Sequence, residues 1–224
     1  MTPYYEQDGI TIYHGDCREV LPSVQFDVVL TDPPYGISWA QIGTGKTAKT
    51  LGMRTHQPII GDDDVSVRDA ALAMIGCRPA LVFGSFYAPF PPGVVQVLVY
   101  QKTPDAGLVG SVNGFRRDAE PIFLLGDWPS LNARWSSVVA SRIGLQALTK
   151  PGFHPHAKPL DVLFALLLAM PGGVAADPFM GSGSMLVAAK RQGRKAIGIE
   201  IEERHCETAV RRLAQGALPM EFSA

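Results

Sequence analysis

The amino-acid sequence predicts an α/β fold built on a doubly wound, mixed but mostly parallel sheet, and three observations support this prediction. Short runs that are apolar on both faces, such as 26–31 and 80–85, are typical of parallel strands covered by helices. Segments of helical length, such as 160–170 and 202–215, alternate with some of these runs. A glycine-rich turn at 181–183, between a strand and a helix, is typical of a ligand-binding edge.

The expected elements follow one another along one domain that spans residues 1–224. Strands are expected at 10–15, 26–31, 80–85, 94–100, 121–126, 173–178 and 195–200. Helices are expected at 65–76, 160–170, 184–192 and 202–215. The last of these begins with acidic residues and ends with basic ones, as the helix dipole favours.

Two segments interrupt this pattern. Residues 40–60 are rich in Gly, Thr and Lys without periodicity, and we predict a mobile loop there. Residues 127–157 carry Trp128, Trp135 and three prolines, and we predict an irregular, short target-recognition insertion. Long loops in a compact domain are usually functional or disordered, so both inserted loops are candidates for binding a substrate.

Composition narrows the class of protein. A hydrophobic content of 46% excludes a disordered chain, and the longest apolar run, 162–170, is about half a membrane span. The N-terminal residues 1–9 show no signal peptide. Cys17, Cys77 and Cys206 are scattered and lack metal-ligand spacing. We therefore expect a cytoplasmic protein with reduced thiols, no metal site and no contact with a membrane.

Positive charge is concentrated in the two interrupting segments, although the formal net charge is only −1. No Asp or Glu occurs in 40–60 or in 128–160. Such segments can form a surface that binds a polyanion, and two solvated loops explain the same charges equally well. The candidate phosphate contacts are Lys46, Lys49, Arg54, Arg134, Arg142 and Lys150.

The glycine-rich turn has the pattern of a site for an adenosine-type cofactor. Gly181 and Gly183 permit a tight turn and a close approach of a ligand to the backbone. Glu200 follows Gly181 by 19 residues, at the end of the next strand. An acid at this place in Rossmann-type sites binds ribose hydroxyls. Leu186 stands where a dinucleotide fingerprint has a third glycine, so a purely structural connection is the alternative.

A rigid elbow follows the strand 26–31, formed by Asp32, Pro33, Pro34 and Tyr35. The two prolines fix φ and remove two backbone donors, so the turn is stiff and presents carbonyl oxygens. A carboxylate beside a carbonyl offers two hydrogen-bond acceptors, and the tyrosine offers a stacking surface. This set suits a planar group with an exocyclic amine, such as adenine or cytosine. A structural turn with its tyrosine in the core is the alternative.

Five segments together resemble one known family. "DPPYG" at 32–36 comes early and "DPFMGSG" at 177–183 comes late, and shorter similar segments lie at 13–17, 115–126 and 154–167. They resemble the S-adenosylmethionine-dependent amino-group DNA methyltransferases, which act on adenine N6 or cytosine N4, in their β-type permuted arrangement. The resemblance covers nearly the whole chain. It implies a circularly permuted, Rossmann-like methyltransferase fold.

The resemblance also implies a mechanism. The carboxylate of Asp32 and the carbonyl of Pro33 would accept the two amine hydrogens, which localises the lone pair for direct displacement on the methyl donor. Pro34 would stiffen the elbow, and Tyr35 would stack on a base flipped out of the duplex. Asp in the first position favours adenine N6. The alternatives are N4 of cytosine in DNA, an RNA base, or a catalytically silent nucleic-acid-binding relative.

The expected cofactor is S-adenosylmethionine, with S-adenosylhomocysteine as product. The residues that the resemblance places around it are Asp16, Cys17, Asp32, His154, Lys158, Pro159, Asp177, Pro178, Phe179, Gly181, Ser182, Gly183, Glu200 and Ile201. Lys158 would meet the methionine moiety and Glu200 the ribose, while Asp16 would meet the adenine edge or simply form a turn. Expected partners are double-stranded DNA and a second copy of the chain. The resemblance favours restriction-modification in a prokaryotic or phage-host cytoplasm.

Overall fold

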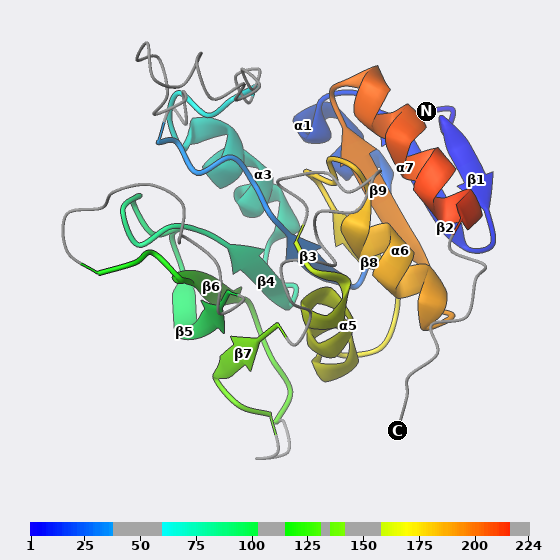
Figure 1. Ribbon diagram of the computed structural model, residues 1–224. Coiled ribbons are helices and arrows are strands. Elements are labelled where there is room, and N and C mark those ends of the chain that lie inside the picture. Colours follow the sequence, from blue (N-terminus) through cyan, green and yellow to red (C-terminus); the bar gives the residue numbers. More distant parts are fainter. Residues whose placement is uncertain (38–59, 103–114, 131–134, 142–157, 216–224) are drawn as a thin grey trace, which may run out of the picture.

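The computed structural model describes residues 1–37, 60–102, 115–130, 135–141 and 158–215, which form one sheet with helices on both faces (Figure 1). The strands are β1 (Tyr5–Gln7), β2 (Ile10–His14), β3 (Val28–Thr31), β4 (Ala80–Phe83), β5 (Val94–Gln101), β6 (Ala119–Leu125), β7 (Val138–Ala140), β8 (Ala175–Asp177) and β9 (Ala196–Glu200). The helices are α1 (Cys17–Val20), the 3-10 turn η1 (Leu21–Ser23), α3 (Ser66–Ile75), α5 (Leu160–Ala169), α6 (Ser184–Arg191) and α7 (Glu203–Gln215).

In the described part of the chain the strands follow the order β1-β2-β9-β8-β3-β4-β6-β5-β7. The central strands β2, β9, β8, β3 and β4 all run parallel. Antiparallel pairs join β1 to β2, β4 to β6 and β6 to β5, and β7 lies parallel to β5. Strands β3 and β8 are neighbours in the sheet, although β4 to β7 and α5 lie between them in the sequence. Segments far apart in the sequence therefore meet in the centre of the sheet.

Two apolar layers cover the sheet. Alternate side chains of β3 point to opposite faces, as the pleat requires, with Val28 and Leu30 on one face and Val29 on the other. Helices α5, α6 and α7 pack on the first face, and α1 and α3 pack on the second (Figure 1). Because both faces are covered, the central strands are mostly apolar, and all four residues of β3 are buried.

The predicted fold class is confirmed: the sheet is mixed, mostly parallel and covered by helices on both faces. Every expected strand and helix is present, with bounds that differ by at most two residues. The prediction that 127–157 is wholly irregular is wrong, because Val138–Ala140 forms β7. Strand β1 and helix α1 were not predicted, since three or four residues are too few to show a period.

Several predictions concern residues outside the described part of the chain. These include nearly all of the segment 40–60 and most of the segment 142–157. The single-domain assignment and the circular permutation stay predictions. Among the described residues, no helix combines the length and apolar character needed to cross a bilayer.

Candidate active site at the carboxyl edge of the sheet

The carboxyl ends of three adjacent parallel strands bring the predicted motifs together. The elbow follows β3, the glycine turn follows β8, and Glu200 ends β9. Thr31, the last residue of β3, donates a 2.7 Å hydrogen bond from Oγ1 to Oδ1 of Asp177, the last residue of β8. Parallel α/β sheets bind ligands at this edge. The topology therefore places the elbow beside the glycine turn.

Asp32 is held by two protein donors. The hydroxyl of Tyr35 donates to its Oδ1 at 2.7 Å, and Nζ of Lys158 lies 3.0 Å from its Oδ2. The same Nζ donates to the Tyr35 hydroxyl oxygen at 3.0 Å and lies 5.0 Å from the ring centroid of Phe83. The elbow, the end of β4 and the start of α5 thus converge on one ammonium group.

A second carboxylate completes this group; it lies in the segment 115–126 that resembles the family, and the sequence predicted no role for it. Oε2 of Glu120 lies 3.1 Å from Nζ of Lys158, and its Oε1 lies 2.6 Å from Nζ of Lys102. Burial favours the protonated acid, but Lys158 and Lys102 outweigh it and hold the pKa of Glu120 below its usual value. We call Asp32, Glu120, Lys102 and Lys158 the ion-pair group.

The same environment controls the other two titrating groups near the elbow. Burial would lower the pKa of Lys158, yet the nearby carboxylates of Asp32 and Glu120 outweigh it and hold that pKa well above its usual value. Burial, reinforced by Asp32, raises the pKa of Tyr35 well above its usual value. At neutral pH the lysine is therefore a cation and the tyrosine a neutral hydroxyl that can donate.

Asp177 is a buried acid at the start of the glycine turn. Its side chain is 5% exposed and accepts from Thr31 Oγ1 and from the backbone N–H of Phe179 at 3.1 Å. Burial raises the pKa of Asp177 from 3.8 to about 7, against the effect of these two hydrogen bonds. Pro178, the next residue, is also buried.

Two glycines shape the turn for different reasons. Gly183 has φ +74, and a Cβ there would lie 2.7 Å from Cβ of Ala209 in α7. Gly181 has φ +48 and open space where a Cβ would be. Its N–H donates to Oε2 of Glu200 at 2.9 Å, while the N–H of Glu202 donates to Oε1 at 2.9 Å. Gly183 therefore allows α7 to pack closely against the turn, and Gly181 leaves open space over the backbone.

Arg212, near the end of α7, braces the glycine turn from behind. Its Nη1 donates to the carbonyl and to Oγ of Ser182, both at 2.7 Å, and to Oγ of Ser184 at 3.0 Å. The sequence indicated Arg212 only as part of a basic helix end. Three hydrogen bonds from one guanidinium nitrogen fix the position of the turn that follows β8.

The predicted residues at the β2 end of the edge have local partners. Asp16 caps α1 by accepting from the N–H of Arg18 at 2.8 Å, and the Arg18 side chain lowers the pKa of Asp16. Burial raises the pKa of the Cys17 thiol to about 12. Ile201 is 46% exposed beyond β9, and its carbonyl lies 3.1 Å from Nε2 of His14. These contacts agree with a turn at Asp16, and its contact with adenine stays a prediction.

The remaining predicted residues divide into two sets. Pro33 and Pro159 are buried, and Pro34 and Phe179 are half-buried. The others lie outside the described residues, namely His154, Lys46, Lys49, Arg54, Arg134, Arg142 and Lys150. Within the described part of the chain no cluster of three or more His, Cys, Asp or Glu side chains could hold a metal ion.

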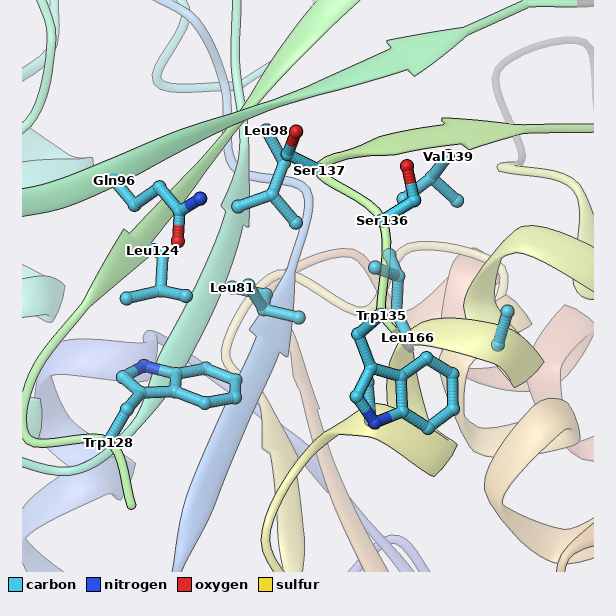
Figure 2. Close-up of a pocket in the computed structure, with 12 residues that line it drawn as sticks. Leu81, Gln96, Leu98, Leu124, Trp128, Trp135, Ser136, Ser137, Val139 and Leu166 are labelled. Carbon is cyan, nitrogen blue, oxygen red and sulfur yellow. The ribbon is translucent and has the colours of Figure 1, made fainter. Parts of the chain in front are cut away.

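A separate apolar pocket of about 110 Å³ lies between α5 and the strands β5, β6 and β7. Figure 2 shows Trp128 and Trp135 on either side of it, with Leu81 and Leu124 between them. It reaches Leu166 in the second half of α5, whereas Lys158, at the centre of the ion-pair group, lies before the first turn of that helix. The pocket is therefore not part of the edge that carries the motifs.

Comparisons with known proteins agree with this arrangement. A family model described as "DNA methylase", for N6 and N4 methyltransferases, matches residues 129–211. The "Putative methylase YubD" of Escherichia coli (strain K12) is 30% identical over 222 residues, which cover 94% of this chain and 92% of that protein. The type II methyltransferase M2.LlaDCHI of Lactococcus lactis subsp. cremoris is 27% identical over 255 residues, covering 96% and 93%.

A solved structure shows the same fold. The M1.HpyAVI–SAM complex superposes with a TM-score of 0.57 at 21% identity, covering 91% of this chain and 98% of that one. The described sheet, the adjacent motifs and the near full-length match to YubD agree with one another. This chain belongs to the DNA methylase family of N6 and N4 amino-methyltransferases.

Proposed function

We propose that this protein is a site-specific DNA methyltransferase that transfers a methyl group from S-adenosylmethionine to N6 of adenine. One observation carries the proposal. The elbow carboxylate of Asp32 and the glycine turn after Asp177 follow adjacent parallel strands, and the Thr31–Asp177 hydrogen bond joins those strands. An acceptor for an amine and a turn for an adenosine-type ligand thus share one edge.

The residues at this edge fit S-adenosylmethionine. Open space lies over Gly181, and the carboxylate of Glu200 stands beside it with lone pairs left for ribose hydroxyls. The fold also occurs in a relative solved with S-adenosylmethionine. When bound, the cofactor supplies an electrophilic methyl group. We assign its binding to the glycine turn, Asp177 and Glu200, with Phe179 and Ile201 at the margin.

The chain's own residues would act by position and charge. Asp32 and the carbonyl of Pro33 accept the two hydrogens of the target amine, which localises its lone pair. The neutral hydroxyl of Tyr35 donates to Oδ1 of Asp32 and fixes the carboxylate plane. The prolines keep these groups rigid while the flipped base enters. The transfer is a direct displacement and needs no covalent enzyme intermediate.

The choice of adenine rests on the aspartate in the first position of the elbow. The family contains both N6 and N4 enzymes, so N4 of cytosine is the second candidate. Both amines are planar and offer two hydrogens to the same acceptors. We favour adenine, and identifying the methylated base in DNA distinguishes the two candidates.

An exposed aromatic surface supports DNA as the substrate. It is formed by Phe86, Tyr87 and Phe90, which are 48%, 68% and 48% exposed in the connection from β4 to β5. The guanidinium of Arg117 lies 4.4 Å from the ring centroid of Tyr87. Because β4 runs parallel to β3, this connection starts at the same edge as the elbow. Aromatic rings and arginine suit unstacked bases and phosphates.

Expression in a bacterial host without DNA methylation tests the proposal. Genomic DNA is sequenced by a method that separates N6-methyladenine from N4-methylcytosine. We expect N6-methyladenine at one short motif with the wild type and none with Asp32→Ala, which should still bind S-adenosylmethionine in calorimetry. Asp63→Ala, which removes an exposed carboxylate, is the control and should methylate normally. N4-methylcytosine in place of N6-methyladenine would identify cytosine N4 as the acceptor. An active Asp32→Ala would refute the mechanism.

A further inference from the structure

The ammonium of Lys158 lies between two carboxylates at nearly equal distances. Its Nζ is 3.0 Å from Oδ2 of Asp32 and 3.1 Å from Oε2 of Glu120, and its side chain is only 13% exposed. The other oxygen of Asp32 accepts from the Tyr35 hydroxyl. Both oxygens of the carboxylate that should receive the target amine therefore already have donors from the protein.

Each carboxylate oxygen can accept a second hydrogen bond, so a target amine does not have to displace the ammonium but competes with it for Asp32, and it is bound more strongly when the ammonium moves away. Breaking a buried ion pair leaves a charged group without a partner, and this strongly raises the free energy of that state. Glu120 already contacts Lys158, so the lysine can leave Asp32 and keep an anionic partner. Lys102 holds the other oxygen of Glu120 at 2.6 Å and keeps that carboxylate in place.

We propose that Glu120 is a positioning residue for methyl transfer, which retains the Lys158 ammonium when a target amine takes its place on Asp32. This inference rests on the proposed function. The described contacts of the Glu120 carboxylate are with Lys158 and Lys102, so it acts on Asp32 through the lysine. Lys158 and Glu120 are both charged at neutral pH, so the exchange moves a cation and no proton.

The variant Glu120→Gln keeps the shape of the side chain and removes its charge. The full-length protein is assayed in single turnover with tritiated S-adenosylmethionine at saturation and plasmid DNA from a host without methylation. We expect about tenfold slower transfer, equivalent to about 1.4 kcal/mol, because the lysine is then bound to Asp32 alone. The dissociation constant of S-adenosylmethionine should stay the same, and Glu120→Asp should recover part of the rate.

Asp118→Asn is the matched control. Asp118 precedes Glu120 by two residues, is 42% exposed on its side chain and pairs with Arg116 at 3.7 Å. This variant makes the same change of charge at the start of β6 without touching Lys158. Its transfer rate should equal that of the wild type.

A double-mutant cycle distinguishes positioning from a general structural effect. If Glu120 acts through Lys158, Glu120→Gln should cause no further loss in a Lys158→Met background.

Three results would overturn the inference while leaving the proposed function intact. They are a wild-type rate in Glu120→Gln, additive losses in the cycle, and a weaker affinity for S-adenosylmethionine with an unchanged rate at saturation. If Glu120→Gln does not fold, Lys102→Met replaces it. That variant removes the lysine that keeps Glu120 in place, so methyl transfer at saturating S-adenosylmethionine should be slower than in the wild type; an unchanged rate contradicts the inference. A wild type that methylates no DNA would instead refute the proposed function.

Discussion

Replacing Asp177 by Asn should make the unliganded protein less sensitive to alkaline pH. The asparagine keeps an oxygen that can accept from Thr31 Oγ1 and from the N–H of Phe179, and it carries no charge. In the wild type, burial raises the pKa of Asp177 from 3.8 to about 7. Ionising this carboxyl group therefore works against the folded state.

The sign and size of the effect follow from proton linkage. Below pH 3.8 both the folded and unfolded chains hold the proton, and the full stability is present. Between pH 3.8 and about 7 only the folded chain keeps it, so the free energy of unfolding falls as pH rises. From pH 5 to pH 8 this one group should remove about 2.6 kcal/mol, at about 1.36 kcal/mol per unit.

Urea unfolding of the wild type and of Asp177→Asn, measured from pH 5 to pH 8, tests this expectation. The difference between the two free energies of unfolding isolates Asp177, because the other titrating groups are shared. The free energy of unfolding of the variant, relative to that of the wild type, should rise by roughly 2–3 kcal/mol from pH 5 to pH 8 and level off above pH 7. Thr31→Val removes a hydrogen bond that favours the ionised carboxylate, so the loss of stability should continue to higher pH and be larger in total. A difference that does not vary with pH would refute the reasoning.

Four further predictions concern the turn and the DNA surface. Gly183→Ala combines strain at φ +74 with a contact at 2.7 Å to Ala209, so calorimetric unfolding should show a loss of about 3 kcal/mol or more. Gly181→Ala meets open space and should lose only about 1–2 kcal/mol of stability, while weakening S-adenosylmethionine binding in titration calorimetry. Arg212→Met leaves the turn carbonyl without its donor and should lower the free energy of unfolding by about 1–3 kcal/mol in urea. Tyr87→Ala should weaken DNA binding by about 1–3 kcal/mol in fluorescence anisotropy, with unchanged cofactor affinity. Equal stability of the two glycine variants, or normal DNA affinity of the tyrosine variant, would contradict these assignments.

The central strands could be predicted from the sequence because their burial on both faces leaves a direct trace in composition. Val28–Thr31 and Ala80–Phe83 are buried throughout and read as continuous apolar runs. Val138–Ala140 could not be found this way. It has three residues at the rim of the sheet, its side chains are partly exposed, and its pairing with β5 depends on contacts made far along the chain.

The place of a candidate site residue was predictable wherever that residue directly ends a strand. Asp32, Asp177 and Glu200 each lie at or just after such an end, beside a proline or glycine turn. Glu120 was not predictable as a partner of Lys158, because its place follows from β6 running antiparallel to β4. That reversal brings the beginning of β6 to the edge where the parallel strands finish, and the sequence gives no sign of it.

Burial of the acids at this edge opposes folding and, under the proposed function, favours binding of the cofactor. Burial raises the pKa of both Asp177 and Glu200, and the charge of Asp32 adds to the effect on Asp177. A cofactor whose sulfonium and ammonium groups outnumber its carboxylate brings net positive charge to such an edge, and its demethylated product does not. Opposite charge lowers the free energy of buried carboxylates. Under the proposed function, carboxylates that destabilise the unliganded fold therefore favour the methyl donor over the product, and the lysine on Asp32 stabilises the elbow until the amine arrives.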